Sequence, residues 1–211
     1  MGVAKEQKTR GRLLQVAMAL FAERGFEKTT MAAISEQAEA NIAAVNYHFG
    51  DKQALYLAAL RAAFAQANTS FPVVLAEEGV SPEQRLRHYI AAQISQIFSA
   101  ADAGYLCRML AKEFAEPTFA IDMIFSELIS QNQAQMWNIV SSILGPKVPE
   151  QQVHLAMVSV VAQFQFYNFT RLIREMGATP ELCLPNPETI AEHIYQFSLA
   201  GLMGMLEANK Q

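Results

Sequence analysis

The stretch of residues 29–52, TTMAAISEQAEANIAAVNYHFGDK, constrains the fold more than any other part of this chain. Apolar residues recur at helical spacing in its first half, and either Thr29 or Thr30 can cap the helix that they predict. We expect a tight turn at residues 39–40 and an N-cap at Asn41 for a second short helix. This order predicts a helix-turn-helix, a motif whose second helix enters the major groove of DNA.

Length and composition favour a wholly helical protein. The chain has 211 residues, enough for one large domain or two small ones, and it is 52% apolar but only 17% charged. Few charges indicate helices with broad buried faces, and no alternating run of residues demands a strand. We therefore predict an all-α fold. The expected helices outside the motif cover residues 10–24, 52–68, 81–101, 105–115, 117–144, 149–176 and 187–208, with loops at 69–82 and 178–187.

The charges are distributed unevenly along the chain. The net charge of −4 at first argues against nucleic acid, but residues 1–52 carry a formal charge of +1 and the remainder carries −5. Between positions 5 and 12 the sequence has four basic residues and a single acidic residue, Glu6. A small basic end on an acidic body fits a DNA-binding module joined to a larger domain that does not bind DNA.

Several kinds of site are not expected. Cys107 and Cys183 stand in no CxxC pair, so we expect two buried or partly buried thiols. The start of the chain is charged and no segment reaches about 18 apolar residues, so we expect a cytoplasmic protein outside the membrane. We expect no metal or cofactor and no enzyme activity, because His88, His154 and His193 lie on separate predicted helices and no nucleophile or phosphate-loop motif is present.

The N-terminal domain of TetR-type transcriptional regulators resembles this chain over about residues 9–60. The pieces LFAERGF, TTM and NYHFGDK occur in the expected order and spacing. Glu39 stands where a glycine is common in the turn, and Asn46 stands where an aromatic residue is common. The resemblance implies a homodimer that reads a palindromic operator, with a three-helix DNA-binding domain at residues 1–51 and a helical ligand-binding and dimerisation domain at residues 52–211.

The resemblance also assigns side chains to the DNA. The residues expected to contact phosphates are Thr30, Tyr47, His48 and Lys52. Those expected to touch base edges are Ile42, Ala43, Ala44 and Asn46, the last through a bidentate contact with adenine. Three alternatives stay open: Ile42 is buried with the apolar stripe of its helix, Tyr47 only packs against the first helix, and Lys52 is a solvated charge.

The chain from about residue 106 onward resembles the C-terminal domain of the CecR-like branch, through the pieces KEFAEPT, AQFQFYNF and HIYQFSLAGL. Its last two helices are apolar on more than one side, so they must be buried on most sides. In a dimer they would form a four-helix bundle, whose candidate contacts are Val158, Val161, Ile194, Phe197, Gly201 and Met205. The alternative is a pair of core helices in a monomer.

Large, adaptable side chains in the same region suit an apolar cavity with a few polar anchors. The apolar candidates are Met109, Phe114, Phe125, Trp137, Phe164, Phe166 and Tyr167, and the polar ones are Arg108, Gln163 and Asn168. A packed core is the alternative for any single residue. We expect a ligand-responsive repressor that binds operator DNA, a small and mostly apolar effector, and a second copy of itself. The competing function is a helical small-molecule-binding or adaptor protein without DNA binding.

Overall fold

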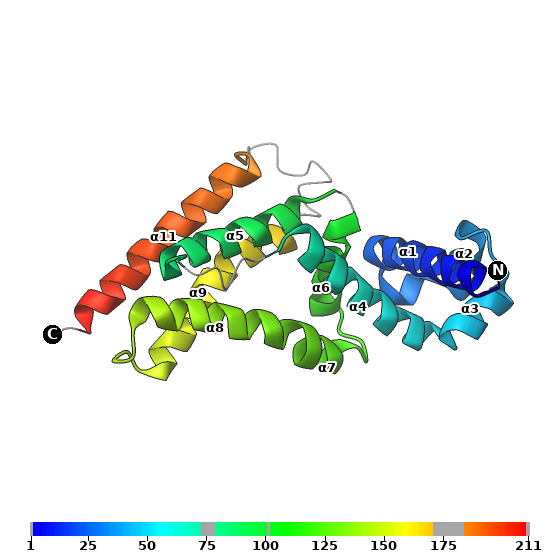
Figure 1. Ribbon diagram of the computed structural model, residues 1–211, viewed down its shortest axis with the longest axis horizontal. Helices are drawn as coiled ribbons and strands as arrows, with labels where there is room; N and C mark the ends of the chain where they lie inside the picture. The colour runs from blue at the N-terminus through cyan, green and yellow to red at the C-terminus, as the bar shows by residue number, and fades with distance from the viewer. Residues whose placement is uncertain (1, 73–78, 101, 171–183, 210–211) are drawn as a thin grey trace. The chain divides into compact units, whose positions relative to one another are not determined.

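The computed structural model describes residues 2–72, 79–100, 102–170 and 184–209 (Figure 1). Every regular element in these residues is helical, which confirms the predicted all-α fold. The chain divides into two compact units, one formed by Met1–Ser70 with Ala100–Ile124 and the other by Phe71–Ser99 with Phe125–Gln211. None of the described helices is long and apolar enough to cross a membrane.

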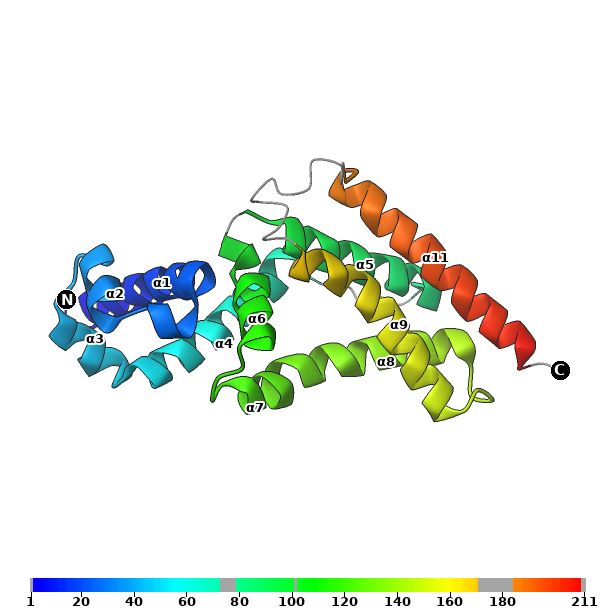
Figure 2. The ribbon, with the colours of Figure 1, turned by 180° about the vertical axis from the view of Figure 1, so that it is seen from behind.

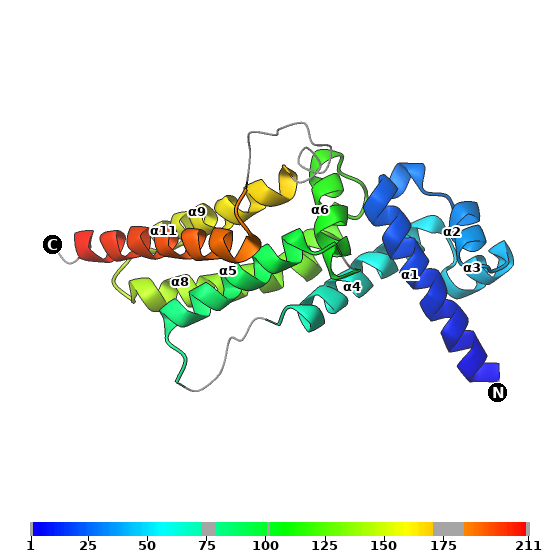
Figure 3. The same ribbon diagram turned by 90° about the horizontal axis from the view of Figure 1, so that it is seen from above.

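The first unit combines the N-terminal helices with elements from later in the chain. Its elements are α1 (Gly2–Lys28), α2 (Met31–Gln37), α3 (Ile42–Phe49), α4 (Lys52–Ser70), the 3-10 turn η1 (Asp102–Gly104), α6 (Tyr105–Ala115) and α7 (Ile121–Met123). α1 packs against both α4 and α6, around the buried side chains of Leu20, Phe21 and Tyr56. α1 begins at Gly2, well before the predicted start at residue 10, and its N-terminal turns extend away from α2 and α3 (Figure 3).

The second unit is a bundle of four long helices. Its elements are α5 (Pro82–Phe98), α8 (Ser130–Leu144), α9 (Glu150–Phe169) and α11 (Pro187–Ala208), and the π-helical turn η2 (Ile124–Ile129) leads the chain into α8. α5 contacts each of the other three helices, and α9 crosses α8 (Figure 2). Ile90, Ile94 and Ile139 are fully buried in this core.

The predicted helix ends are confirmed where a capping residue marks them. The Ser81 hydroxyl accepts a hydrogen bond from the Gln84 amide at 3.3 Å, and the Gln84 side chain accepts one from the Ser81 amide at 3.1 Å. Two unpartnered amides at the start of α5 are thereby satisfied, which is why the helix begins there. The Asn186 side chain plays the same part before α11, accepting from the Thr189 amide at 2.8 Å.

The single helix predicted for residues 117–144 is wrong in its first half. The chain turns at Thr118, forms the short α7 and the π-helical turn η2, and becomes a regular α-helix only from Ser130. The Thr118 hydroxyl accepts a hydrogen bond from the Ala120 amide at 3.2 Å, which supports a turn rather than a helix at this point. The predicted end of the next helix, near residue 176, lies outside the described residues, as does most of the loop at 178–187.

Candidate nucleic-acid interface

Three side chains fix the first residues of α2 and α3, which form the helix-turn-helix, and of α4, which follows it. Thr30 is the N-cap of α2 and accepts a hydrogen bond from the Ala33 amide at 3.1 Å. Asn41 caps α3 by accepting from the Ala43 amide at 2.9 Å. Asp51 accepts from the Ala54 amide at 2.8 Å, at the start of α4. Each cap satisfies a backbone amide that has no partner within its helix, so the local sequence alone sets these three starting points.

α3 has one buried face and one exposed face. Val45 and Phe49 are buried beneath the helix. Ile42 is 45% exposed, so it is not buried with the apolar stripe of its helix, and Tyr47 is 75% exposed, so it is not covered by the first helix. Ala43 and Asn46 are also exposed, while Ala44 and His48 are half-buried. The outer face of α3 therefore presents aliphatic groups and the Asn46 amide to solvent.

The turn between α2 and α3 holds a backbone conformation that favours glycine. Glu39 has φ 47°, and it is the one non-glycine residue with positive φ in the described part of the chain. The Arg12 side chain donates a hydrogen bond from Nη2 to the Glu39 carbonyl at 3.1 Å. This hydrogen bond from Arg12 on α1 stabilises the turn at Glu39, a position where TetR-type sequences commonly have glycine. No local pattern in the sequence predicts this contact, because the two residues are 27 positions apart.

Two basic side chains lie on aromatic rings, one in α1 and one in α3. The Lys52 ammonium is 4.2 Å from the centroid of the Phe26 ring and donates a hydrogen bond to the Glu27 carbonyl at 3.3 Å. The Arg10 guanidinium is 5.1 Å from the centroid of the Phe49 ring. The face of an aromatic ring attracts a cation, so both charges are held near the start and the end of the motif. Lys52 is therefore not the freely solvated charge that one alternative proposed.

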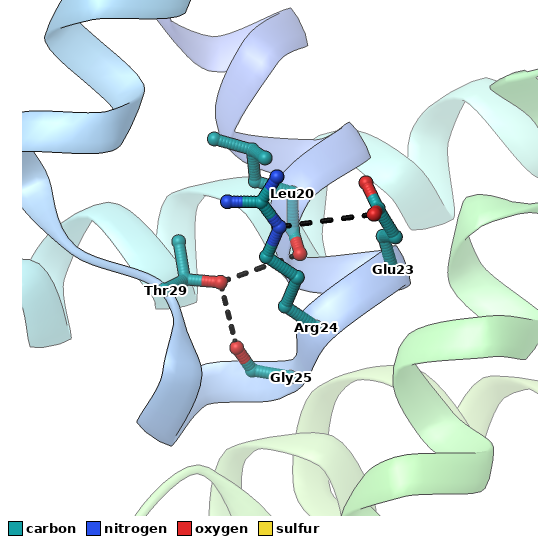
Figure 4. Close-up of polar contacts among 5 residues, drawn as sticks. All are labelled: Leu20, Glu23, Arg24, Gly25 and Thr29. Atoms are coloured by element: carbon teal, nitrogen blue, oxygen red, sulfur yellow. Dashed lines mark hydrogen bonds and ion pairs between the residues drawn. The ribbon is translucent and has the colours of Figure 1, made fainter.

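A buried hydroxyl closes the end of α1 (Figure 4). Gly25 has φ 79° and ψ 176°, which breaks the helical path of α1 near its end. Thr29 is fully buried, and its Oγ1 lies 2.8 Å from the Gly25 carbonyl oxygen and 3.3 Å from that of Leu20. Carbonyls at a helix end lack partners within the helix, and this hydroxyl supplies one. Thr29 thus fixes the junction from which α2 begins, while Thr30 provides the cap.

The candidate dimer residues differ in exposure. Phe197 is 66% exposed, and Val158 and Gly201 are exposed as well, while Val161 and Met205 are half-buried. Ile194, in contrast, is only 2% exposed and belongs to the core of its own chain, so its prediction as a surface contact is wrong. Helical periodicity marked both faces of α11 as apolar but gave no sign of which face the neighbouring helices cover.

The candidate pocket residues are spread over both compact units. Arg108, Met109 and Phe114 belong to α6 in the first unit, and the others belong to the second. Phe164 and Asn168 are buried, and Trp137, Gln163 and Tyr167 are half-buried. Phe125 and Phe166 are exposed, so neither is enclosed in the core of its own chain. Phe166 lies on the same face of α9 as Val158, because eight residues advance an α-helix by little more than two turns.

One buried polar group stands out in the second unit. The Asn168 side chain is 3% exposed, and its Nδ2 reaches Gln165 Oε1 only at 3.5 Å. Its Oδ1 accepts no hydrogen bond in the described part of the chain. Nearby, the Gln163 side chain donates to the Ser198 hydroxyl at 2.9 Å and so links α9 to α11. Buried acceptors are costly when they stay unpaired.

Two protein families match this chain. Residues 13–59 match "Bacterial regulatory proteins, tetR family", and residues 82–202 match "HTH-type transcriptional dual regulator CecR, C-terminal domain". The chain is 24% identical over 184 residues to the HTH-type transcriptional dual regulator CecR of Shigella flexneri, an alignment that covers 81% of each protein. It is 34% identical over 95 residues, 43% of each protein, to the HTH-type transcriptional repressor NicS of Pseudomonas putida.

The fold agrees with these matches. The solved structure of the fatty acid degradation regulator FadR from Bacillus halodurans superposes with a TM-score of 0.71 at 12% identity, covering 92% of this chain and 96% of that one. At this identity the likeness concerns the fold alone. The first match covers the motif built on α2 and α3, and the second covers more than half of the chain. The chain therefore belongs to the TetR family of bacterial DNA-binding transcriptional regulators, which are not enzymes, and it carries a C-terminal domain of the CecR type.

Proposed function

We propose that this ligand-responsive regulator is a repressor that binds a palindromic operator as a homodimer and leaves it when a small, mostly apolar effector binds. In this proposal residues 1–51 form the DNA-binding domain, residues 52–211 form the effector-binding and dimerisation domain, and Lys52 at the start of the second domain also reaches the DNA. The observation that carries the proposal is the exposed outer face of α3, with Tyr47 75% exposed above a buried Val45 and Phe49. A solvent-exposed tyrosine and isoleucine on one short capped helix suit a surface that DNA covers.

The proposed phosphate contacts are Thr30, Tyr47, His48 and Lys52. Each phosphate neutralised by a cation adds about one unit to the slope of log affinity against log salt. Lys52→Ala should therefore reduce that slope by about one, measured by fluorescence anisotropy over a salt series. Lys147→Ala is the matched control, because Lys147 is an exposed lysine between α8 and α9. An equal effect of both substitutions would contradict a direct contact by Lys52.

The proposed base contacts are Ile42, Ala43, Ala44 and Asn46. Asn46→Ala should change the preferred base at one position of each half-site, since a bidentate contact discriminates between bases. Tyr47→Ala should instead weaken all duplexes alike, because a phosphate contact carries no sequence information. Selection from a random duplex pool with each variant distinguishes the two outcomes. Identical selected sequences and identical losses would refute the assignment of roles.

The proposed dimer face consists of the exposed apolar residues of α9 and α11. Its members are Leu155, Val158, Ala162, Phe166, Phe169, Phe197 and Gly201, flanked by the half-buried Val161 and Met205. A second copy of this chain would remove these groups from water, which makes pairing favourable. Phe197→Glu should shift the protein to monomers in analytical ultracentrifugation. Phe125→Glu, which charges another exposed ring outside the two helices, should leave the dimer intact.

The proposed effector site includes Asn168 beside Phe164. The buried Oδ1 of Asn168 has no donor in the described part of the chain, and apolar side chains adjoin it on α9. An apolar molecule with one hydroxyl or amide donor would satisfy it. A panel of phenols, alcohols and fatty amides is first tested for compounds that release the wild-type protein from DNA. We expect Asn168→Leu to bind DNA as tightly as the wild type but to be released less readily by those compounds. Unchanged release would remove Asn168 from the site.

The repressor role is tested by transcription in vitro from a template that carries the selected operator. We expect less transcript with the protein than without it, as the name of the relative NicS would suggest, whereas CecR is named a dual regulator. More transcript would contradict repression on that promoter. The adaptor alternative predicts no salt-dependent binding to any duplex, and such a result would end the proposal as a whole.

A further inference from the structure

Glu113 near the end of α6 is the one charged residue that is fully buried in the described part of the chain. Its side chain is 1% exposed. A carboxylate is retained in such a place only when hydrogen-bond donors replace the water that it has lost. The identity of those donors shows which elements the carboxylate holds together.

The donors come from two different places in the first unit. Tyr56 on α4 donates its hydroxyl to Glu113 Oε1 at 2.7 Å. Thr118, in the turn before α7, donates its amide to Oε2 at 3.1 Å, and its hydroxyl lies 2.9 Å from Oε1 and 3.1 Å from Oε2. Glu113 therefore closes the corner after α6 and fastens that corner to α4. Hydrogen bonds to an ionised carboxylate are stronger than those between neutral groups, so this point resists displacement.

Tyr56 connects the same carboxylate to the DNA-facing end of α4. Its ring is 4.7 Å from Phe21 and 5.1 Å from Phe26, measured between ring centroids. The Lys52 ammonium lies 4.2 Å from the centroid of the same Phe26 ring. Lys52 is the first residue of α4, one helical turn before Tyr56, and α3 packs against α4. A change in the position of α4 against α6 would therefore move Lys52 and α3 together.

We propose that Glu113 is a positioning residue for operator recognition, which acts through Tyr56 to hold α4 at one orientation and thereby sets the half-site spacing that the dimer accepts. This inference rests on the proposed binding of a palindrome by a homodimer. The chain continues from α7 into the unit that carries the proposed dimer face. Along the chain, the corner that Glu113 closes is followed by α7 and then by the segment that leads into that unit.

The test uses the full-length protein and duplexes with two half-sites. Each duplex carries the preferred spacer or one that is a base pair shorter or longer, and a fourth duplex carries one half-site. We expect Tyr56→Phe and Glu113→Gln each to reduce discrimination between spacers by about tenfold, the scale set by one lost hydrogen bond to a charged group. Affinity for the single half-site should not change. Tyr89→Phe is the matched control, because it also deletes a buried phenol hydroxyl, in α5 of the other unit.

The outcomes separate this inference from the proposed function. If the wild type shows no preference among spacers, the palindrome proposal and this inference both fail. If the wild type has a preference that Tyr56→Phe and Glu113→Gln retain, the inference alone fails. If both substitutions weaken binding equally on every duplex, the single half-site included, Tyr56 and Glu113 have a merely structural role. That result would also overturn the inference. Urea unfolding of each variant shows whether it is folded, and Tyr56→Phe keeps the ring and its packing.

Discussion

Replacing Gly25 with alanine tests whether backbone geometry sets the break in α1. Gly25 adopts φ 79° and ψ 176°, a conformation that residues with a side chain rarely take. An added Cβ would meet only the Cδ atom of Lys112 at 3.4 Å, an ordinary van der Waals contact. The cost therefore comes from the backbone and not from crowding. We expect Gly25→Ala to lower the free energy of unfolding by about 1–3 kcal/mol.

Gly11 offers a matched control within the same helix. A Cβ added there meets no atom within 4 Å, and the residue has helical geometry. Gly11→Ala should raise the free energy of unfolding by about 0.5–1 kcal/mol, because alanine loses less backbone entropy in a helix. Gly25→Asn should not restore stability. Asparagine tolerates the left-handed α conformation with ψ near about +47°, which differs from the ψ of 176° at Gly25.

Urea unfolding followed by far-ultraviolet circular dichroism measures all three variants at equal protein concentration, since pairing of chains would affect the midpoint. For a chain of this size, each 1 kcal/mol corresponds to a change of roughly 2–4 °C in Tm. Gly25→Ala and Gly11→Ala should move the midpoint in opposite directions. If Gly25→Ala is as stable as the wild type, or if both substitutions destabilise alike, the argument from backbone geometry is refuted.

Three further predictions concern stability. Thr29→Val should lower the free energy of unfolding by about 1–2 kcal/mol, because it removes a buried donor from the carbonyls of Gly25 and Leu20; a urea midpoint equal to that of the wild type would contradict this. Glu39→Gly should raise it by about 1 kcal/mol by relieving the positive φ of 47°, and thermal unfolding that shows no gain would mean that the turn stores no strain. Burial and the hydrogen bond to Glu113 raise the pKa of Tyr56, and burial raises that of Tyr89, so both stay protonated when folded but lose the proton near pH 10 when unfolded. Stability should thus be fully present below about pH 10 and fall above it by roughly 1.4 kcal/mol per pH unit for each tyrosine, with a smaller fall in Tyr56→Phe.

The parts of the fold that depend on neighbouring residues could be predicted from the sequence. Asn41 and Ser81 begin helices because their side chains bond to amides two or three positions later. The predicted helix end at residue 24 agrees with the break at Gly25, because a glycine readily adopts a positive φ. The buried face of α3 is local in the same sense, because Val45 and Phe49 are spaced by about one turn.

The parts that depend on distant residues could not be predicted. Arg12 meets the carbonyl of a residue 27 positions away, and Tyr56 meets a carboxylate 57 positions away. No local pattern encodes either contact. Periodicity likewise could not assign Ile194 to the core and Phe166 to the surface, because both lie on helices that are apolar on more than one side.

The amino-acid sequence by itself determined the helix-turn-helix, the all-α class and the charges around the motif, because these follow from caps, spacing and composition over a few turns. Only the tertiary structure decided which apolar faces are covered, how Glu39 is held in its turn, and where the buried carboxylate of Glu113 is anchored. Those features arise when helices distant in the chain come into contact, and a hydrogen bond or a buried surface between them depends on positions in space that local sequence does not specify.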